Sequence, residues 1–456
     1  MQHIQGISRH QLQMSSLEDK ITADNPVRFI DAFVNHIDPV KIGFQPKILK
    51  TEGRPNFRLE VFLKLYLYGY LNGVRSSRRL EKECFRNIEV QWLLEAIYPN
   101  YHSIADFRKD NPKALKQLFK LFVSFLKDAE LIAGDTIAID GTKSRAHNSK
   151  KANYNQKKID KHKAYIDAKS QEYLDQLEQN DIQENPVVIK NIQQKIERLK
   201  QNKIKYELLE EELKNSGEPQ ISTTDADARA LLVQGQVVEV SYNIQAAVDS
   251  KHNLVVATHT INRNDKNALA AIALEVKENL ALETFTVLVD KGYHNGRELH
   301  TCKQNNITTI VAVPEQGKSN ENGTQPEYLV SKFIYNKENN SYTCPEGKTL
   351  TTTGSWHKKT GRTEESGYNF QKYRTPACKT CLVKDLCTSR NGGREIDRSQ
   401  YADAVEENHQ RYKDNPQLYR KRQEINEHIF GTIKRKWGYN YTDLVGLEKV
   451  NGEHSL

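Results

Sequence analysis

The chain has 456 residues, with 67 Lys and Arg against 59 Asp and Glu, which gives a formal net charge of +8 and a pI near 8.9. Only 37% of the residues are apolar, and the most apolar stretch, residues 115–132, is interrupted by charged side chains, so a membrane protein is excluded. The N-terminus lacks the layout of a secretory signal, and six cysteines are too few for a disulfide scaffold, so we expect a cytoplasmic protein. Its mild basic charge favours a polyanionic partner.

Residues 1–130 are predicted to form short helices. Residues 57–71 are dense in Phe, Leu and Tyr at helical spacing, Asn72-Gly73 breaks the pattern, and an Arg-rich segment starts the next helix. Short helices joined by tight turns, with arginine at a helix start, fit a helix-turn-helix-like DNA-binding domain. An ordinary helical bundle with a solvated basic turn fits about as well.

Residues 150–220 are predicted to form a helical hairpin, with Pro186 between its two helices. Apolar side chains recur at coiled-coil spacing in both halves, with Lys203 in one seam position: Ile159, Ile166, Tyr173 and Leu177, then Ile189, Ile192, Ile196, Leu199 and Tyr206. Residues 141–170, which include the start of this hairpin, hold nine Lys and Arg and two Asp and Glu, a net charge of +7.

Short β-rich runs flank this hairpin in the sequence. They cover residues 136–139, 237–248, 254–260, 284–289 and 307–313, and residues 265–279 have helical periodicity. Residues 249–253 have the composition of a hairpin turn. The order of strands and helices predicts a mixed α/β sheet.

Two of these strands end on an aspartate. Asp140 and Asp290 both follow an apolar run directly and precede turns that contain glycine. Ligand sites in such sheets lie at the carboxyl ends of the strands. Two carboxylates that converge there need a cation, and oxygen ligands select a hard ion such as Mg²⁺ or Mn²⁺. The alternative is that each aspartate only caps its turn.

Residues 415–437 are predicted to form one basic helix, and residues 411–440 hold eight Lys and Arg against three Asp and Glu, a net charge of +5. On a continuous α-helix, Glu427 and Lys434 point to the same side because they are seven residues apart. Glu427 lies between the basic residues Arg422 and Lys434 in the sequence. A carboxylate flanked by bases in this way suits a metal-bound phosphodiester. A solvated charged helix is the alternative.

Three motifs, taken in order, resemble the DDE transposases of bacterial insertion sequences, in the branch with a Tyr-Arg-Glu-Lys signature. They are Asp140-Gly141-Thr142, Asp290-Lys291-Gly292-Tyr293, and Tyr419-x2-Arg422-x4-Glu427-x6-Lys434. Residues 57–107, 224–229, 242–249 and 428–434 look similar to that family too. The sequence departs from the wider branch in having four residues, rather than three, between Arg422 and Glu427.

The resemblance implies a ribonuclease-H-like core in which Asp140, Asp290 and Glu427 are catalytic and hold two Mg²⁺ ions, with Mn²⁺ as a substitute. It implies two-metal phosphodiester hydrolysis and strand transfer, which cleave the ends of the element and join them to target DNA. The expected phosphate-binding residues are Tyr419, Arg422, Lys434, Lys143 and Arg145. Glu424 is the alternative third acid, and Asp249 and Asp265 are alternatives for the second.

The partner implied is double-stranded DNA, namely the terminal inverted repeats of the element and the target, bound by a homo-oligomer at the nucleoid. Relatives are expected to continue past Leu456 through another helix. A second interpretation is therefore a truncated or domesticated relative that binds DNA without catalysis. A two-metal nuclease without strand transfer is a third, disfavoured by the N-terminal helices and the insert.

Four cysteines are predicted to bind a structural Zn²⁺: Cys344, Cys378, Cys381 and Cys387. Their spacing includes one C-x2-C pair and allows a tetrahedral site, and similar transposases suggest the same. His357 is a possible substitute ligand, and reduced, unbound thiols are the alternative. Cys84 and Cys302 are expected to be core residues.

These predictions divide the chain into six regions. They are an N-terminal helical DNA-binding domain (1–130), the first part of the catalytic core (131–149), a helical-hairpin insert (150–220), the rest of the core (221–314), a polar zinc-binding insert (315–405), and the catalytic helix and tail (406–456). The predicted fold is therefore α/β: a ribonuclease-H-like mixed sheet flanked by helices, with an N-terminal helical domain and two inserts.

Overall fold

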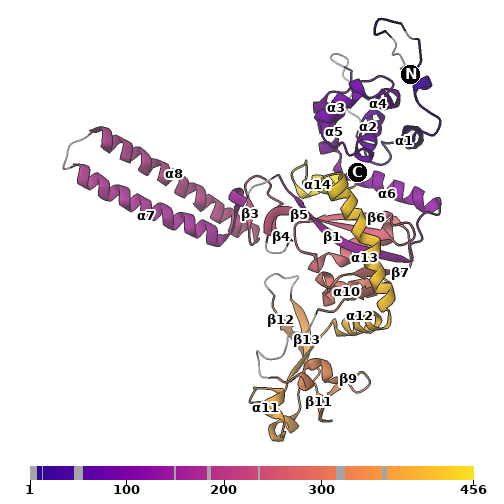
Figure 1. Cartoon of the computed structure of the whole chain (residues 1–456). Helices are drawn as coiled ribbons and strands as arrows, with labels where there is room; N and C mark the ends of the chain where they lie inside the picture. The colour runs from indigo at the N-terminus through magenta and orange to yellow at the C-terminus, as the bar shows by residue number, and fades with distance from the viewer. Residues whose placement is uncertain are drawn as a thin grey trace, which may run out of the picture. The chain divides into compact units, whose positions relative to one another are not determined.

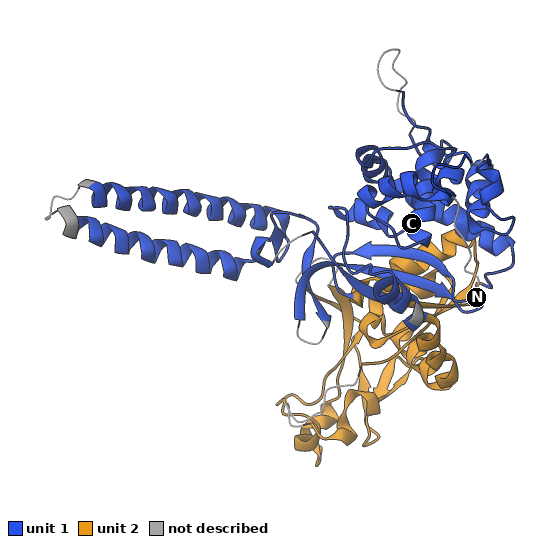
Figure 2. Ribbon diagram, turned by 45° about the horizontal axis from the view of Figure 1, so that its top comes forward, with its two compact units in different colours: residues 1–133, 141–264, 426–456 blue, residues 134–140, 265–425 orange. Residues whose placement is uncertain are grey.

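The computed structural model describes residues 8–12, 14–45, 55–147, 150–181, 186–234, 237–314, 324–361 and 367–456. The chain divides into two compact units (Figure 2). Unit 1 comprises residues 1–133, 141–264 and 426–456, and unit 2 comprises residues 134–140 and 265–425. Each unit is therefore built from segments that are far apart in the sequence.

The N-terminal part of unit 1 consists of short helices. They are α1 (Pro26–His36), α2 (Leu59–Leu71), α3 (Ser77–Arg86), α4 (Ile88–Leu93), α5 (Tyr101–Asp110) and α6 (Pro112–Asp128). Three begin at an asparagine (Asn25, Asn87 and Asn100) whose side chain accepts a hydrogen bond from a backbone N–H in the first turn. The predicted helix at residues 57–71 is confirmed as α2, most of whose side chains are buried.

Two long helices of unit 1, α7 (Gln156–Asp181) and α8 (Pro186–Ser216), pack side by side (Figure 1). Their seam is thin. Ile159, Ile166, Ile192 and Ile196 are buried in it. Lys203 is partly exposed at this seam, and its Nζ lies 2.7 Å from an Asp167 oxygen on the other helix.

A mixed sheet has the strand order β4-β5-β1-β7-β8, with β6 paired to β5. Strand β1 (Thr136–Arg145) contributes residues 136–140 to unit 2 and residues 141–145 to unit 1. In unit 1, β4 (Arg229–Gln234), β5 (Val237–Asp249) and β6 (Val255–Ile261) pair antiparallel, which confirms the predicted hairpin turn at residues 249–253. Two short strands, β2 (Asn153–Tyr154) and β3 (Ile221–Ser222), pair at the base of α7 and α8.

In unit 2, β7 (Phe285–Val289) and β8 (Ile307–Val311) pair in parallel. Parallel neighbours need a crossover, which α10 (Gly296–Gln304) supplies, and α9 (Leu269–Asn279) precedes β7. Helix α12 (Ala402–Asp414) is fixed to β8 by the buried Asn408 side chain, which exchanges two hydrogen bonds of 2.9 and 3.0 Å with the backbone of Val311. The mixed sheet with flanking helices is compatible with the predicted α/β class.

The cysteine-bearing part of unit 2 contains two small antiparallel sheets. One has the order β11-β10-β9 and the other β12-β13-β14. Their bounds are β9 (Ile334–Asn336), β10 (Ser341–Thr343), β11 (Thr349–Thr351), β12 (Trp356–Lys359), β13 (Tyr368–Tyr373) and β14 (Ile396–Ser399), with α11 (Lys384–Cys387) before β14. A small core of Phe333, Tyr342, Leu350, Tyr373 and Ile396 joins the two sheets.

The predicted single helix over residues 415–437 is wrong at its C-terminal end. Helix α13 covers Pro416–Gly431, and a π-helical turn, Thr432–Lys436, follows it before α14 (Leu447–Glu453). A π-turn has more residues per turn than an α-helix, so the seven-residue rule does not apply across Gly431. The expectation that Glu427 and Lys434 share one face therefore loses its basis.

Candidate active site and cysteine cluster

The carboxyl ends of β1 and β7 form an edge of the parallel part of the sheet. Thr136, Ile137 and Ala138 pair with Thr286, Val287 and Leu288, a constant offset along both strands. Two steps further on, the same offset brings Asp140 opposite Asp290. Because side chains alternate along a strand, both aspartates follow the face of Ala138 and Leu288.

Asp140 is half-buried and paired with an arginine. Its Oδ2 lies 3.6 Å from Nη1 of Arg422 on α13, and the two side chains are 34% and 14% exposed. A partly exposed pair of this kind contributes at most about 1 kcal/mol to stability. The Arg422 Nε is buried and has no hydrogen-bond partner among the described residues. An unsatisfied guanidinium N–H beside a carboxylate is suited to an anionic oxygen, such as that of a phosphate.

Asp290 begins a short 3₁₀ turn, Lys291–Tyr293. Its Oδ1 accepts a 2.7 Å hydrogen bond from the backbone N–H of Gly292. A Cβ on Gly292 would come within 2.9 Å of that same oxygen, so only glycine leaves the carboxylate in place. The same Cβ position is 3.9 Å from Cβ of Asp265, which places Asp265 beside this turn. Sequence reasoning ranked Asp265 as an alternative to Asp290, not as its neighbour.

Asp249, the other alternative, is a turn residue of unit 1. It is fully buried, and its Oδ1 accepts hydrogen bonds from the backbone N–H groups of Lys251, at 2.9 Å, and Ala133, at 3.3 Å. These contacts hold the turn between β5 and β6. The hydrogen bonds described for Asp249 are thus both with backbone N–H groups of unit 1.

Helix α13 carries the other predicted residues of the signature. Tyr419 is half-buried, and its ring centroid lies 5.8 Å from the Arg422 guanidinium. Burial raises the pKa of the Tyr419 hydroxyl, and the Asp290 charge adds to this increase, whereas Arg422 lowers the pKa. Glu424 and Glu427 are both exposed. Glu424 belongs to unit 2 and Glu427 to unit 1.

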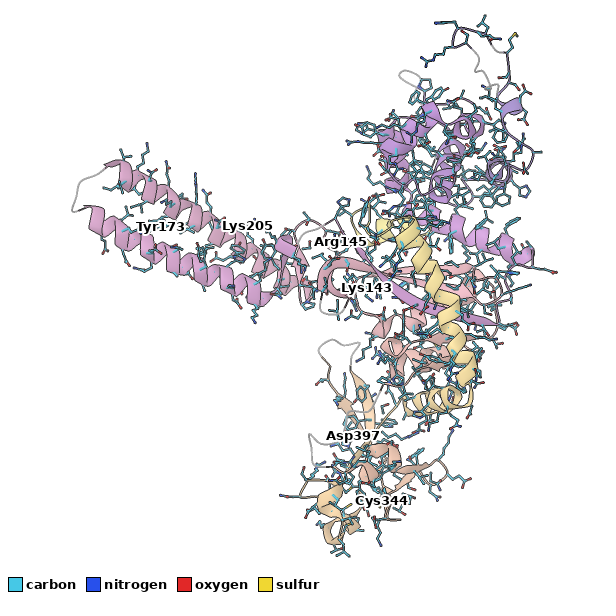
Figure 3. All side chains as sticks on the ribbon, viewed as in Figure 1. Lys143, Arg145, Tyr173, Lys205, Cys344 and Asp397 are labelled. Carbon is cyan, nitrogen blue, oxygen red and sulfur yellow. The ribbon has the colours of Figure 1, made fainter. Side chains whose placement is uncertain are left out.

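Lys434, Lys143 and Arg145 all belong to unit 1 and already have protein partners. Lys434 donates a 2.6 Å hydrogen bond to the carbonyl oxygen of Lys143, and burial, followed by the Lys143 charge, lowers the pKa of its ammonium group. The Arg145 guanidinium pairs with Glu239, at 3.0 Å through Nε. Lys143 and Arg145 lie on β1 (Figure 3). Sequence spacing alone gave no sign of these partners.

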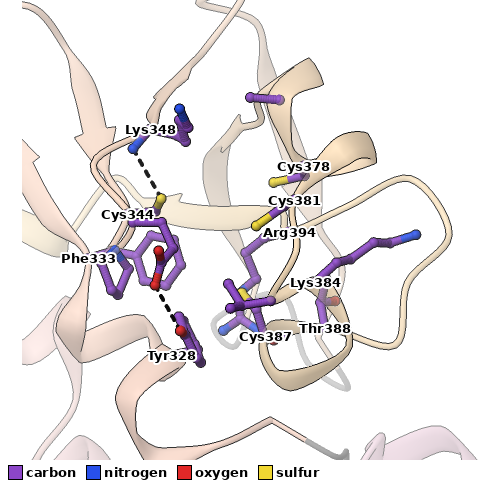
Figure 4. A pocket seen from close by; sticks show the side chains of 14 residues that line it. Tyr328, Phe333, Cys344, Lys348, Cys378, Cys381, Lys384, Cys387, Thr388 and Arg394 are labelled. Atoms are coloured by element: carbon purple, nitrogen blue, oxygen red, sulfur yellow. Dashed lines mark hydrogen bonds between the residues drawn. The ribbon is translucent and has the colours of Figure 1, made fainter.

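The four predicted zinc ligands line one cavity of about 30 Å³ (Figure 4): Cys344, Cys378, Cys381 and Cys387. Burial raises the pKa of the Cys387 thiol, and charge on the other three thiols would raise it further, although Arg394 lowers it. Cys344 lies in a tight turn, where its Sγ accepts a hydrogen bond from the Lys348 N–H at 3.3 Å.

Close packing around Cys378 leaves little freedom there, since a Cβ on Gly393 would overlap its side chain. Cys84 and Cys302 are each 1% exposed, as predicted for core residues. His357, the possible substitute ligand, is exposed on β12 and does not line the cavity.

Within the described ranges, no group of three or more His, Cys, Asp or Glu side chains is arranged to hold a metal ion. The four thiols line one cavity without forming a metal site. At the sheet edge, Asp140 and Asp290 follow neighbouring parallel strands, and Asp265 lies near Gly292. No helix in the described part of the chain is long and apolar enough to span a membrane.

Comparison with protein-family models gives two matches. Residues 15–110 match a family described as a transposase domain (DUF772), and residues 343–456 match a transposase DDE domain. Together the two matches support a DDE transposase. The first match covers α1 to α5, and the second runs from the cysteine cluster through α13 to the last residue. No curated protein and no solved structure matches the chain.

Proposed function

We propose that this transposase cleaves the ends of an insertion sequence and joins them to target DNA in a reaction that depends on Mg²⁺. The observation that carries the proposal is the parallel pairing of β1 with β7, whose common register brings Asp140 and Asp290 to one edge. We further propose a ribonuclease-H-like core and membership of the Tyr-Arg-Glu-Lys branch. The match of residues 343–456 to a transposase DDE domain supports a DDE transposase, and the mixed sheet with flanking helices is compatible with such a core.

The donor set at this edge fits a hard cation. Asp140 and Asp290 supply carboxylate oxygens, both side chains are half-buried, and neither neighbouring strand offers a sulfur or imidazole ligand. Asp140, Asp290 and Glu427 would hold two Mg²⁺ ions, or Mn²⁺ in their place. When bound, such ions stabilise negative charge on phosphodiester oxygens and lower the pKa of water.

The chain itself contributes positioning and charge. The Arg422 guanidinium, whose Nη1 lies 3.6 Å from Asp140, would bind a phosphate oxygen there, and Tyr419 packs against the same guanidinium. Lys143, Arg145 and Lys434 would bind phosphates further along the DNA, after Arg145 releases Glu239. The Gly292 N–H fixes the Asp290 carboxylate, which keeps its oxygens pre-oriented.

The partners proposed are the terminal inverted repeats of the element and the target DNA, processed at the nucleoid by a homo-oligomer because two ends must be joined together. Binding should weaken steeply with salt, since phosphate contacts dominate such complexes.

The first prediction concerns Asp140. Wild-type protein incubated with Mg²⁺ and a DNA fragment bearing the repeats that flank its gene should yield joined products on a sequencing gel. Asp140→Asn should lower cleavage at least about 100-fold, because it removes a charge from the metal site, and should leave DNA binding largely intact. Asp397→Asn, at an exposed carboxylate of β14, is the matched control and should cleave normally.

An unchanged cleavage rate in Asp140→Asn would refute the assignment of this residue. Nicks without joined products would favour a nuclease. A mobility shift without any cleavage by the wild type would favour the non-catalytic DNA-binding relative.

The second prediction separates the two candidate third acids on α13. Glu427→Gln should abolish joining in the same assay, and Glu424→Gln should retain at least about half of it, because surface substitutions seldom disturb a fold. Both side chains are exposed, so circular dichroism should show folded protein in each case. Loss of activity in Glu424→Gln alone would make Glu424 the third acid.

We also propose that the cysteine cluster binds one structural Zn²⁺ ion. Its four thiols line one cavity, and four thiolates are the ligand set of a tetrahedral structural zinc site. The small core of the cysteine-bearing sheets includes few apolar residues, so metal binding would supply much of its stability.

The third prediction follows from this cluster. Purified protein should contain about one zinc per chain by atomic emission, and Cys378→Ser should lose most of it. Cys302→Ala alters a buried thiol outside the cluster and should keep the metal. Equal zinc content in wild type and Cys378→Ser would rule out this site.

A further inference from the structure

Strand β12 is an open edge of the sheet β12-β13-β14. Its residues Trp356, His357, Lys358 and Lys359 pair on one side with β13, and all four side chains are exposed. The Trp356 side chain is 57% exposed. In the part of the chain that the structure describes, no further strand pairs with the other side of β12. The four residues of this strand are called the β12 edge below.

The charges of the β12 edge have no ion-pair partner among the residues that the structure describes. Neither Lys358 nor Lys359 takes part in an ion pair found between described residues; Lys359 lies only over the Tyr368 ring, 5.6 Å from its centroid. The neighbouring bases behave differently. Lys372, Arg374 and Arg390 all pair with the one carboxylate of Glu395. Among the described residues, positive charge is therefore paired behind the strand and unpaired along its edge.

Protection of the edge explains only part of this pattern. Lysines on an edge strand prevent unwanted pairing with other strands. A large exposed indole in the same strand works against that protection, because it adds apolar surface. Because side chains alternate along a strand, Lys358 follows the face of the exposed Trp356 ring and Lys359 follows the other face. A lysine beside an exposed aromatic ring suits a ligand that carries both phosphates and flat bases, as a nucleic acid does.

The sheet behind this edge is held firmly. Arg398 of β14 donates to the Tyr342 hydroxyl at 2.9 Å and to Asp403 at 2.5 Å, and its guanidinium lies 3.5 Å from the Tyr335 ring centroid. Strand β14 pairs with β13, and β13 with β12. A ligand at the edge would thus meet a rigid strand, which lowers the entropy lost on binding.

We propose that the β12 edge binds DNA: Lys358 and Lys359 contact phosphates, and Trp356 packs against a base in an unpaired stretch. This inference rests on the proposed function, since it names a second surface for the same substrate. The charge of the edge is complementary to a polyanion.

The test measures fluorescence anisotropy of labelled DNA with the full chain, using a blunt duplex and the same duplex with a single-stranded overhang, over a range of salt. Lys358→Gln/Lys359→Gln should weaken binding to both at least about fivefold and lower the salt slope by about two. Trp356→Ala should weaken binding to the overhang DNA at least about fivefold and leave the blunt duplex nearly unaffected. Lys332→Gln/Lys337→Gln, at exposed lysines elsewhere in unit 2, is the matched control and should bind like wild type.

Wild-type affinity and salt slope in the Lys358/Lys359 variant would overturn the inference, and equal effects of Trp356→Ala on both DNAs would overturn the role of the indole. If either result is obtained while the wild type still joins DNA ends, the proposal for the β12 edge fails and the proposed function stands. A wild type that neither binds nor joins DNA would instead refute the proposed function.

Discussion

The parallel ladder between β1 and β7 is the constraint on which the candidate site depends. Parallel strands emerge at the same edge, and a common register with alternating side chains puts equivalent residues on the same face. Three buried residues precede each aspartate, so neither strand can slip without exposing its apolar side chains. Asp140 and Asp290 are thereby held at one edge, where two like charges raise the free energy unless a cation compensates them.

Nearby contacts of unit 2 reduce that cost without removing it. Arg422 lies 3.6 Å from Asp140, and the Gly292 N–H satisfies one oxygen of Asp290. Asn408 fixes α12 to β8, and α13 follows α12 after a single residue, so the helix that carries Arg422 is anchored to the same sheet. The remaining need for positive charge at the edge is what a divalent ion would meet.

Much of this arrangement is predictable from the sequence, for identifiable reasons. The strands at residues 136–139 and 284–289 have no competing helical periodicity, and each ends on Asp, so their existence and their ends are clear. The seam of α7 and α8 is predictable because isoleucines recur at coiled-coil spacing. The four cysteines were grouped by spacing, and they do line one cavity.

Other features depend on tertiary contacts that spacing does not encode. The π-turn after Gly431 has no sequence signal of its own, so the sequence predicts a continuous α-helix there. The hydrogen bond from Lys434 to the Lys143 carbonyl joins residues 291 positions apart. Asp265 lies beside Gly292 because two 3₁₀ turns, Asp265–Asn267 and Lys291–Tyr293, pack together. The glycine two positions after Asp290 indicates that space is scarce there.

Direct measurement of metal binding at the sheet edge tests the central claim. Electron paramagnetic resonance can follow a titration of Mn²⁺, a paramagnetic substitute for Mg²⁺, into wild-type protein, Asp140→Asn, Asp290→Asn and the surface control Asp397→Asn. The account predicts that each of the two edge variants weakens Mn²⁺ binding about tenfold or more, while the control binds like wild type. Unchanged Mn²⁺ binding in either edge variant would contradict it.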